Sequence, residues 1–170
     1  MKELANLIPT YNNFPKKGIS FKDVLEIVQE PKIFRELILK MSSNKIIKNS
    51  EAIVSIDARG FIFGSAIALH SSKPMIFARK PGKLPGEVIE QSYELEYGTN
   101  TISIQKKALA KYSTYSIVDD LIATGGTAKS VANLLQKQGK TITGLLSVVD
   151  LKDIPKKEKL EFPVESIITL

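Results

Sequence analysis

The sequence lacks cysteine and tryptophan and contains a single histidine. Without cysteine, the chain has no thiol nucleophile, no redox pair, no disulfide and no cysteine-ligated zinc. At 170 residues with 43% hydrophobic side chains, a chain can bury roughly 70% of the surface that it exposes when unfolded. We therefore expect one domain, spanning residues 1–170, whose core is held by packing alone.

Long apolar runs are also missing. The longest strongly apolar stretch, residues 61–69, is nine residues long and includes a glycine and a serine, whereas a bilayer-spanning helix needs roughly 20 apolar residues. The first residues show no basic region followed by an apolar run, which a secretory signal would need. We expect no membrane insertion and a cytoplasmic location.

The positive charge is unevenly distributed. The net charge is +6, and residues 58–86 contain five basic side chains and no acidic one, so the rest of the chain carries only +1. Residues 87–105 hold four acids and no base. A duplex-binding surface tends to spread its cations along a face. The pattern therefore favours a small polyanionic substrate over nucleic acid, and the lysines at 152, 156, 157 and 159, interspersed with acids, indicate a solvated surface.

Strand and helix patterns alternate along the chain. Apolar strand patterns occupy residues 51–56, 74–78, 115–118, 141–149 and 162–170, and helix patterns follow Pro31, Gly60 and Thr127. This order predicts an α/β fold in which helices flank a mostly parallel central sheet. Residues 10–23 indicate irregular structure. Residues 79–104 combine glycine, proline and charge with two short alternating stretches, which is typical of a flexible functional loop with antiparallel strands.

The clearest motif is the segment from Asp119 to Thr127, between a predicted strand and a predicted helix. Gly125 and Gly126 allow a sharp turn, and the N–H groups that open a helix attract phosphate. Asp119 and Asp120 would repel a phosphate but can accept hydrogen bonds from sugar hydroxyls. The segment is neither a Walker loop nor a dinucleotide fingerprint. It predicts a ribose 5-phosphate site at the carboxyl end of a strand.

With two acids followed by Ala-Thr-Gly-Gly-Thr, the chain resembles the type I phosphoribosyltransferases. Further stretches resemble the members of that family that act on adenine: residues 14–23 (FPKKGISFKD), 57–64 (DARGFIFG), 79–86 (RKPGKLPG) and 93–98 (YELEYG). The resemblance covers roughly residues 10–150 in the family's order. It implies a type I phosphoribosyltransferase fold with a base-binding hood at residues 1–30 and a flexible catalytic lid at residues 79–104.

The resemblance also implies the binding residues. Asp119 and Asp120 would face the ribose hydroxyls, and the 5-phosphate would lie on Ala123, Thr124, Gly125, Gly126 and Thr127. The pyrophosphate would meet Ala58, Arg59, Gly60, Arg79, Lys80 and Lys83. The base would be held by Ile19, Ser20, Phe21 and Leu121. Magnesium is expected on the pyrophosphate substrate, with no metal bound directly by side chains, and a homodimer is implied as well.

The implied reaction transfers the 5-phosphoribosyl group of phosphoribosyl pyrophosphate to adenine and yields AMP and pyrophosphate. Arg59 would stabilise the leaving group, while Glu96 and Tyr97 would reach the reacting centre from the lid; Glu96 is the candidate for proton transfer. Three other acids lie close to it, at 87, 90 and 94. Transfer to xanthine, hypoxanthine or guanine stays open, as does a ligand-sensing regulator with this fold.

Overall fold

A five-stranded parallel sheet forms the centre of the molecule. The computed structural model describes residues 2–95, 98–156 and 159–170. The strand order is β4-β3-β7-β8-β9, with β3 (Ala52–Ile56), β4 (Met75–Ala78), β7 (Thr114–Ile122), β8 (Thr141–Asp150) and β9 (Val164–Thr169). All four neighbouring pairs run parallel. The predicted α/β fold is confirmed, including β9 at the sheet edge.

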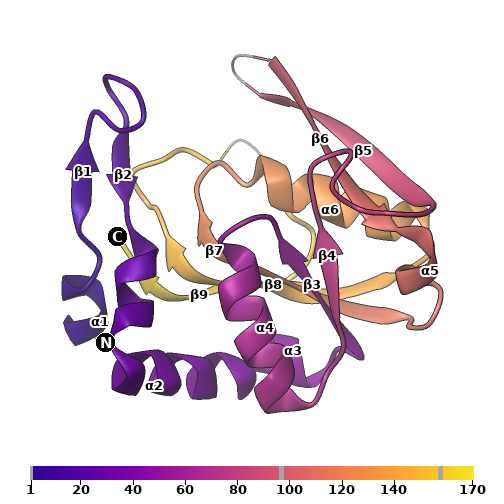
Figure 1. Cartoon of the computed structure of the whole chain (residues 1–170), viewed down its shortest axis with the longest axis horizontal. Coiled ribbons are helices and arrows are strands. Elements are labelled where there is room, and N and C mark those ends of the chain that lie inside the picture. Colours follow the sequence, from indigo (N-terminus) through magenta and orange to yellow (C-terminus); the bar gives the residue numbers. More distant parts are fainter. Residues whose placement is uncertain (1, 96–97, 157–158) are drawn as a thin grey trace.

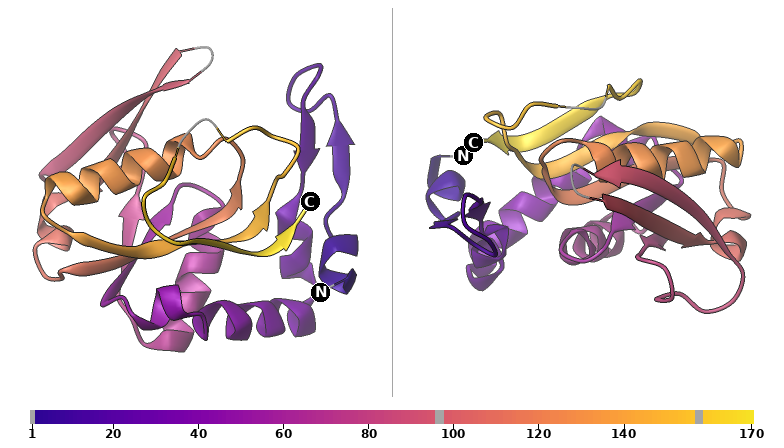
Figure 2. Two further views of the ribbon diagram at one scale, coloured as in Figure 1. Left: turned by 180° about the vertical axis from the view of Figure 1, so that it is seen from behind. Right: turned by 90° about the horizontal axis from the view of Figure 1, so that it is seen from above.

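Helices cover both faces of this sheet (Figures 1 and 2). On one face, α2 (Pro31–Ser42) and α4 (Gly60–Ser71) pack with the six-residue 3₁₀ helix η1 (Val24–Gln29), and Ile53, Val118 and Leu146 point into that core. On the other face lies α6 (Gly126–Lys137), over Ile117 and Leu145. Consecutive strand residues enter opposite cores because side chains alternate along a strand. Three short helices complete the chain: α1 (Lys2–Asn6), α3 (Lys45–Lys48) and α5 (Lys106–Leu109).

Two antiparallel hairpins rise on opposite sides of the sheet's carboxyl edge (Figures 1 and 2). The first joins β1 (Thr10–Asn12) to β2 (Ser20–Lys22). The second joins β5 (Val88–Leu95) to β6 (Gly98–Gln105). The second hairpin is anchored at its base, where Ile102 and Ile104 are buried in the core and Arg79 and Ser103 exchange backbone hydrogen bonds of 2.9 and 2.7 Å.

The structure corrects two predictions. Residues 10–23 are not irregular throughout, because β1 and β2 pair around the turn that holds Pro15 and Gly18. The strand predicted to end at Val118 continues through both aspartates to Ile122, since β8 pairs with it as far as Asp150. The predicted polar turn is thereby reduced to three residues, 123–125, before α6 begins. No helix in the described ranges is long and apolar enough to cross a membrane.

Candidate functional site

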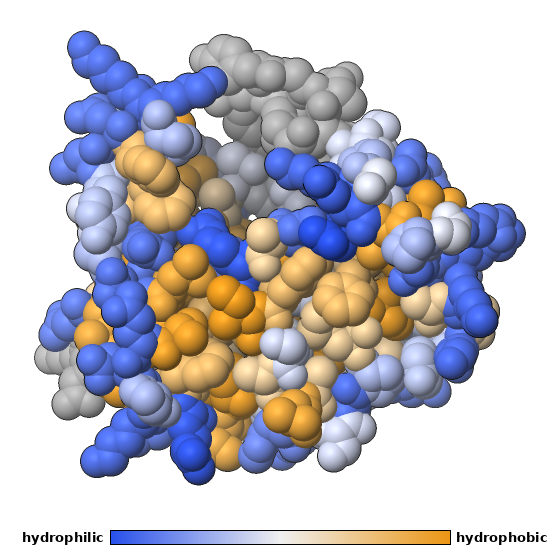
Figure 3. Space-filling model, viewed as in Figure 1, coloured by the Kyte–Doolittle hydropathy of each residue, from blue (hydrophilic) through white to orange (hydrophobic). Residues whose placement is uncertain are grey.

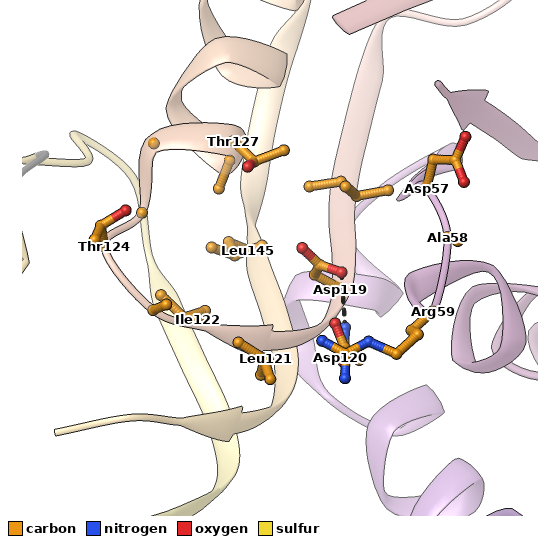
Figure 4. Close-up of a pocket in the computed structure, with 15 residues that line it drawn as sticks. Asp57, Ala58, Arg59, Asp119, Asp120, Leu121, Ile122, Thr124, Thr127 and Leu145 are labelled. Carbon is orange, nitrogen blue, oxygen red and sulfur yellow. Dashed lines mark hydrogen bonds and ion pairs between the residues drawn. The ribbon is translucent and has the colours of Figure 1, made fainter. Parts of the chain in front are cut away.

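A cavity of about 230 Å³ opens at the carboxyl ends of β3 and β7. Two loops form its walls: residues 57–59, which follow β3, and residues 123–125, which follow β7 (Figure 4). Ile56 and Leu145 add apolar lining from the sheet, and the first residues of α6 line it as well. Carboxyl ends of adjacent parallel strands meet at one edge, so two segments distant in the sequence form a single site.

The loop from Ala123 to Gly125 delivers the start of α6 to this cavity. Gly125 has φ +88°, in the left-handed region that glycine enters without strain. The first N–H groups of a helix have no partner within it and carry partial positive charge. Thr124 and Thr127 line the same cavity. All five residues predicted for the 5-phosphate therefore lie together on a surface suited to an anion.

The two aspartates lie in the last part of β7, on opposite faces of the strand. Figure 4 shows Asp120 turned toward Arg59 and Asp119 turned away from it. Burial raises the pKa of the Asp119 carboxyl well above its ordinary value of 3.8, and the adjacent Asp120 charge raises it further. Burial also raises the pKa of Asp120, while the nearby Arg59 guanidinium opposes that rise. Asp119 also packs on Gly60, where an added Cβ would lie 2.9 Å from its Oδ1.

Arg59 joins the acidic pair to the first hairpin. Its Nε lies 2.9 Å from Asp120 Oδ2, and its guanidinium carbon lies 5.0 Å from the centre of the Phe21 ring. Phe21 in turn meets Phe14 edge to face at 5.1 Å. Of the residues predicted for the base, Leu121 lines the cavity, whereas Ile19, Ser20 and Phe21 lie on the hairpin beside it. Arg59 therefore lies between the first hairpin and the two aspartates.

Only some of the residues predicted for the pyrophosphate line the cavity. Ala58 and Arg59 line the cavity, and Gly60 opens α4 directly behind them. Arg79 follows β4 and reaches the cavity only through Asp57, to which its Nε is paired at 2.9 Å. Lys80 and Lys83 are exposed and lie outside the lining. Glu96 and Tyr97 lie outside the described residues, so their catalytic roles stay predictions.

Two contributors were missed at the sequence level. Asp57 lies in the motif at residues 57–64 but is not among the predicted site residues, and its ion pair with Arg79 depends on β3 and β4 being neighbours. Lys156 was expected on a solvated surface. The residue is exposed, and its ammonium also donates to the carbonyl oxygens of Ile122 at 3.2 Å, Ala123 at 2.8 Å and Leu151 at 2.9 Å. The sequence carries no local signal for either contact.

The two carboxylates at the cavity fit a magnesium ion that arrives with a phosphate-bearing substrate. The described ranges contain no group of three or more His, Asp and Glu side chains placed to hold a metal. Mg²⁺ commonly binds through one or two carboxylates together with substrate phosphates and water. Asp119 and Asp120 line the cavity, and carboxylate oxygens are among the ligands that Mg²⁺ accepts.

Comparison with known proteins agrees with this geometry. Residues 21–168 match the family model described as the phosphoribosyl transferase domain. A curated relative from Prochlorococcus marinus (strain MIT 9515), named adenine phosphoribosyltransferase, is 66% identical over 167 residues, which cover 98% of each chain. The chain belongs to the adenine phosphoribosyltransferase family.

Solved structures of this family share the fold. The adenine phosphoribosyltransferase of Thermoanaerobacter pseudethanolicus is 35% identical and covers 99% of both chains with a TM-score of 0.91. The enzyme of Saccharomyces cerevisiae, complexed with an imino-altritol bisphosphate and adenine, is also 35% identical, with a TM-score of 0.86 over 98% of this chain and 97% of its own. The predicted family and fold class are thus confirmed.

Proposed function

We propose that the chain transfers the 5-phosphoribosyl group of phosphoribosyl pyrophosphate to adenine, giving AMP and pyrophosphate. The observation that carries this proposal is the pair of aspartates that runs directly into the Ala123–Thr127 anion site, facing the arginine-bearing loop across one cavity. The relatives named adenine phosphoribosyltransferase, at up to 66% identity over nearly the whole chain, support the choice of acceptor. The chain is accordingly an enzyme of purine salvage.

The chemistry sets two tasks for the site. Adenine N9 attacks C1 of the ribose, the C1–oxygen bond to pyrophosphate breaks, and the N9 proton must be removed. Positive charge grows on the sugar in the transition state while negative charge grows on the leaving pyrophosphate. Groups that are already oriented toward these developing charges give the largest contribution to such catalysis.

The described residues divide these tasks between the two walls. The Ala123–Thr127 loop holds the 5-phosphate, and Asp119 and Asp120 accept hydrogen bonds from the ribose hydroxyls and lie near the developing positive charge. Arg59, with Ala58 and Gly60, receives the pyrophosphate. The Phe21 ring stacks on one face of the base, and Leu121 contacts the opposite face. The assignment of Arg79, Lys80 and Lys83 to pyrophosphate stays a prediction, and so does proton removal by Glu96.

Magnesium and a homodimer belong to the same proposal. When bound with the substrate, magnesium would neutralise pyrophosphate charge, and Asp119 and Asp120 are the side chains placed to meet it. Apolar side chains gather on one face of the molecule (Figure 3). There Ile62, Leu69 and Phe77 are at least 36% exposed on α4 and β4, which supports burial of this face between two copies. The cytoplasmic location expected from the sequence stays a prediction.

An assay with a panel of purine bases tests the acceptor. We expect phosphoribosyl pyrophosphate and magnesium to convert adenine to AMP, with kcat/KM at least about a hundredfold above the values for hypoxanthine, guanine and xanthine. Efficient use of xanthine without use of adenine would contradict adenine as the acceptor, but the assignment as a phosphoribosyltransferase would stand. Tight, salt-sensitive binding of duplex DNA without any turnover would instead support the ligand-sensing regulator.

A further inference from the structure

Lys156 lies behind the 5-phosphate loop, on the segment that links β8 to β9. It is absent from the residues that line the cavity. Its ammonium nevertheless reaches the backbone where β7 ends and the loop begins, through the carbonyl oxygens of Ile122 and Ala123. A third bond to the Leu151 carbonyl and an ion pair with Asp150 Oδ1 at 2.6 Å fix the ammonium on the β8 side. One side chain thus ties the loop to the end of the neighbouring strand.

The bond to Ala123 also orients the peptide group that enters the anion site. In a trans peptide the C=O and the following N–H point in opposite directions. Because the Ala123 carbonyl points to Lys156, the Thr124 N–H points away from Lys156. Thr124 lines the cavity and Lys156 does not, so the loop runs between them. Lys156 therefore holds this peptide with its carbonyl turned away from the bound anion.

Without the Lys156 ammonium, the Ala123–Thr124 peptide could also turn its carbonyl oxygen toward the cavity. A carbonyl oxygen turned into the cavity would repel phosphate. The Ala123–Thr124 peptide lies in the three-residue loop between the end of β7 at Ile122 and the start of α6 at Gly126. Lysine side chains are flexible, and the Lys156 side chain is 36% exposed. The three N–H donors of its ammonium nevertheless lie within 3.2 Å of four oxygen atoms, all on two segments next to the site.

We propose that Lys156 is a positioning residue for the phosphoribosyl group: it fixes the backbone of the 5-phosphate loop from behind and so sets the affinity for phosphoribosyl pyrophosphate, without touching the substrate. The proposal rests on the assignment of the 5-phosphate to the Ala123–Thr127 loop. It assigns no step of the reaction to Lys156. We expect a selective consequence, because three of the four residues predicted for the base, Ile19, Ser20 and Phe21, lie on the first hairpin.

Steady-state kinetics of Lys156→Met test the proposal. Methionine keeps the length of the side chain but removes all of its hydrogen bonds. We expect the KM for phosphoribosyl pyrophosphate to rise about tenfold, as for loss of hydrogen bonds from a charged donor, while kcat and the KM for adenine change less than about twofold. Titration calorimetry with ribose 5-phosphate should show the same loss. Lys156→Arg, which keeps charge and donors, should stay within about threefold of the unaltered enzyme.

Matched variants separate the possible failures. Lys152→Met removes an exposed lysine from the same segment and should leave all constants unchanged. Thr124→Val removes a hydroxyl from the loop itself and should raise the KM for phosphoribosyl pyrophosphate. If Thr124→Val does so and Lys156→Met does not, the positioning role is overturned while the loop assignment stands. If Thr124→Val has no effect, the assignment of the 5-phosphate to the loop is contradicted, and the proposal that rests on it falls as well. Equal losses in both KM values and in Tm for Lys156→Met would show a purely structural role and overturn the proposal.

Discussion

At the residue scale, Asp119 carries a cost to stability that its position in the site explains. It is a carboxylate enclosed at the end of a buried strand, beside a second carboxylate, and both circumstances raise its pKa above 3.8. The folded protein therefore binds the Asp119 proton more tightly than the unfolded chain does. Where the carboxyl is ionised, this makes a negative contribution to the free energy of unfolding.

The variant Asp119→Asn should be more stable than the unaltered enzyme and less active. The stabilisation that protonated Asp119 gives is complete below the ordinary carboxyl pKa near 3.8 and is lost as pH rises through the raised pKa. Asparagine carries no charge at any pH. We expect Tm of the variant to exceed that of the unaltered enzyme by about 2–4 °C at pH 8, with the difference narrowing toward pH 4.

Thermal unfolding across this pH range, followed by circular dichroism, measures the difference. Asp153→Asn, at an exposed position, is the matched control and should show no such trend. The kcat/KM of Asp119→Asn should fall at least about tenfold, because an amide is a weaker acceptor for the ribose hydroxyls than a carboxylate. If the Tm difference between Asp119→Asn and the unaltered enzyme were no larger at pH 8 than at pH 4, the argument that burial raises the Asp119 pKa would be contradicted.

Some residues of the site could be predicted from sequence because their roles depend on neighbours in the chain. Asp119 to Thr127 is one continuous segment, so a strand, a turn and a helix start already specify its chemistry. The contact of Lys156 with the loop could not be predicted, since Ile122 and Ala123 lie 34 and 33 residues away and accept through backbone carbonyls, which leave no trace in residue identity. Asp57 was missed for the same reason, because Arg79 becomes its neighbour only when β4 pairs with β3.

At the element scale, the second hairpin combines a buried base with strands that rise beyond the sheet. Ile104 is fully buried, and Ile102 is 3% exposed. The β5 strand packs on α6, where Lys137 Nζ donates to Gln91 Oε1 at 2.7 Å. The alternation of Ile102 and Ile104 predicted antiparallel strands here, and the structure confirms them. The sequence alternation could not show that the base of the hairpin joins the core on the α6 face, because that depends on the position of β4 at the edge of the sheet.

Shortening Ile104 should therefore destabilise the whole domain rather than the hairpin alone. Ile104→Ala leaves a cavity in a core that α6, β6 and the sheet share, and we expect a loss of about 2–5 kcal/mol in the free energy of unfolding. Urea unfolding, monitored by circular dichroism, measures this loss. The control Leu39→Ala removes the same number of carbon atoms from a side chain that is 45% exposed on α2 and should cost less than about 1 kcal/mol. Equal costs for the two variants would show that the hairpin base is not part of the cooperative core.

The first hairpin shows where pattern reading is weak. Its strands are three residues each, too short for alternation to be recognised, and the 3₁₀ helix that follows is six residues long with only Val24 and Ile27 buried. The hairpin is held instead by contacts between side chains, such as Phe14 on Phe21 and Arg59 over Phe21. Such contacts become visible only when α4 and the hairpin are placed together.

At the scale of the whole molecule, the fold gathers most of the excess charge at one edge of the sheet. Arg59 follows the end of β3, and Arg79, Lys80 and Lys83 follow the end of β4, next to it. Lys73 is the exception, since its ammonium donates to the carbonyl oxygens of Lys48 and Ser50, before β4 begins. Four of the five cations in residues 58–86 thus surround the edge at which the cavity opens.

This arrangement predicts a salt dependence that is specific to one substrate. Raising the ionic strength from 0.1 to 1 M shortens the Debye length from about 10 to about 3 Å, which screens exposed cations from a polyanion. We expect the KM for phosphoribosyl pyrophosphate to rise about fivefold or more over this range at constant free magnesium, while the KM for neutral adenine changes less than about twofold.

Two glutamine variants assign this effect to the charged edge. Lys80→Gln removes an exposed cation from that edge and should flatten the salt dependence, because less attraction remains to be screened. Lys107→Gln removes an exposed cation from α5 and should leave the slope unchanged. If both variants changed the slope equally, the net charge of +6 would act as a whole and its concentration at the sheet edge would be irrelevant. A flatter slope for Lys107→Gln, with no change for Lys80→Gln, would place the charge that attracts the substrate on α5 instead.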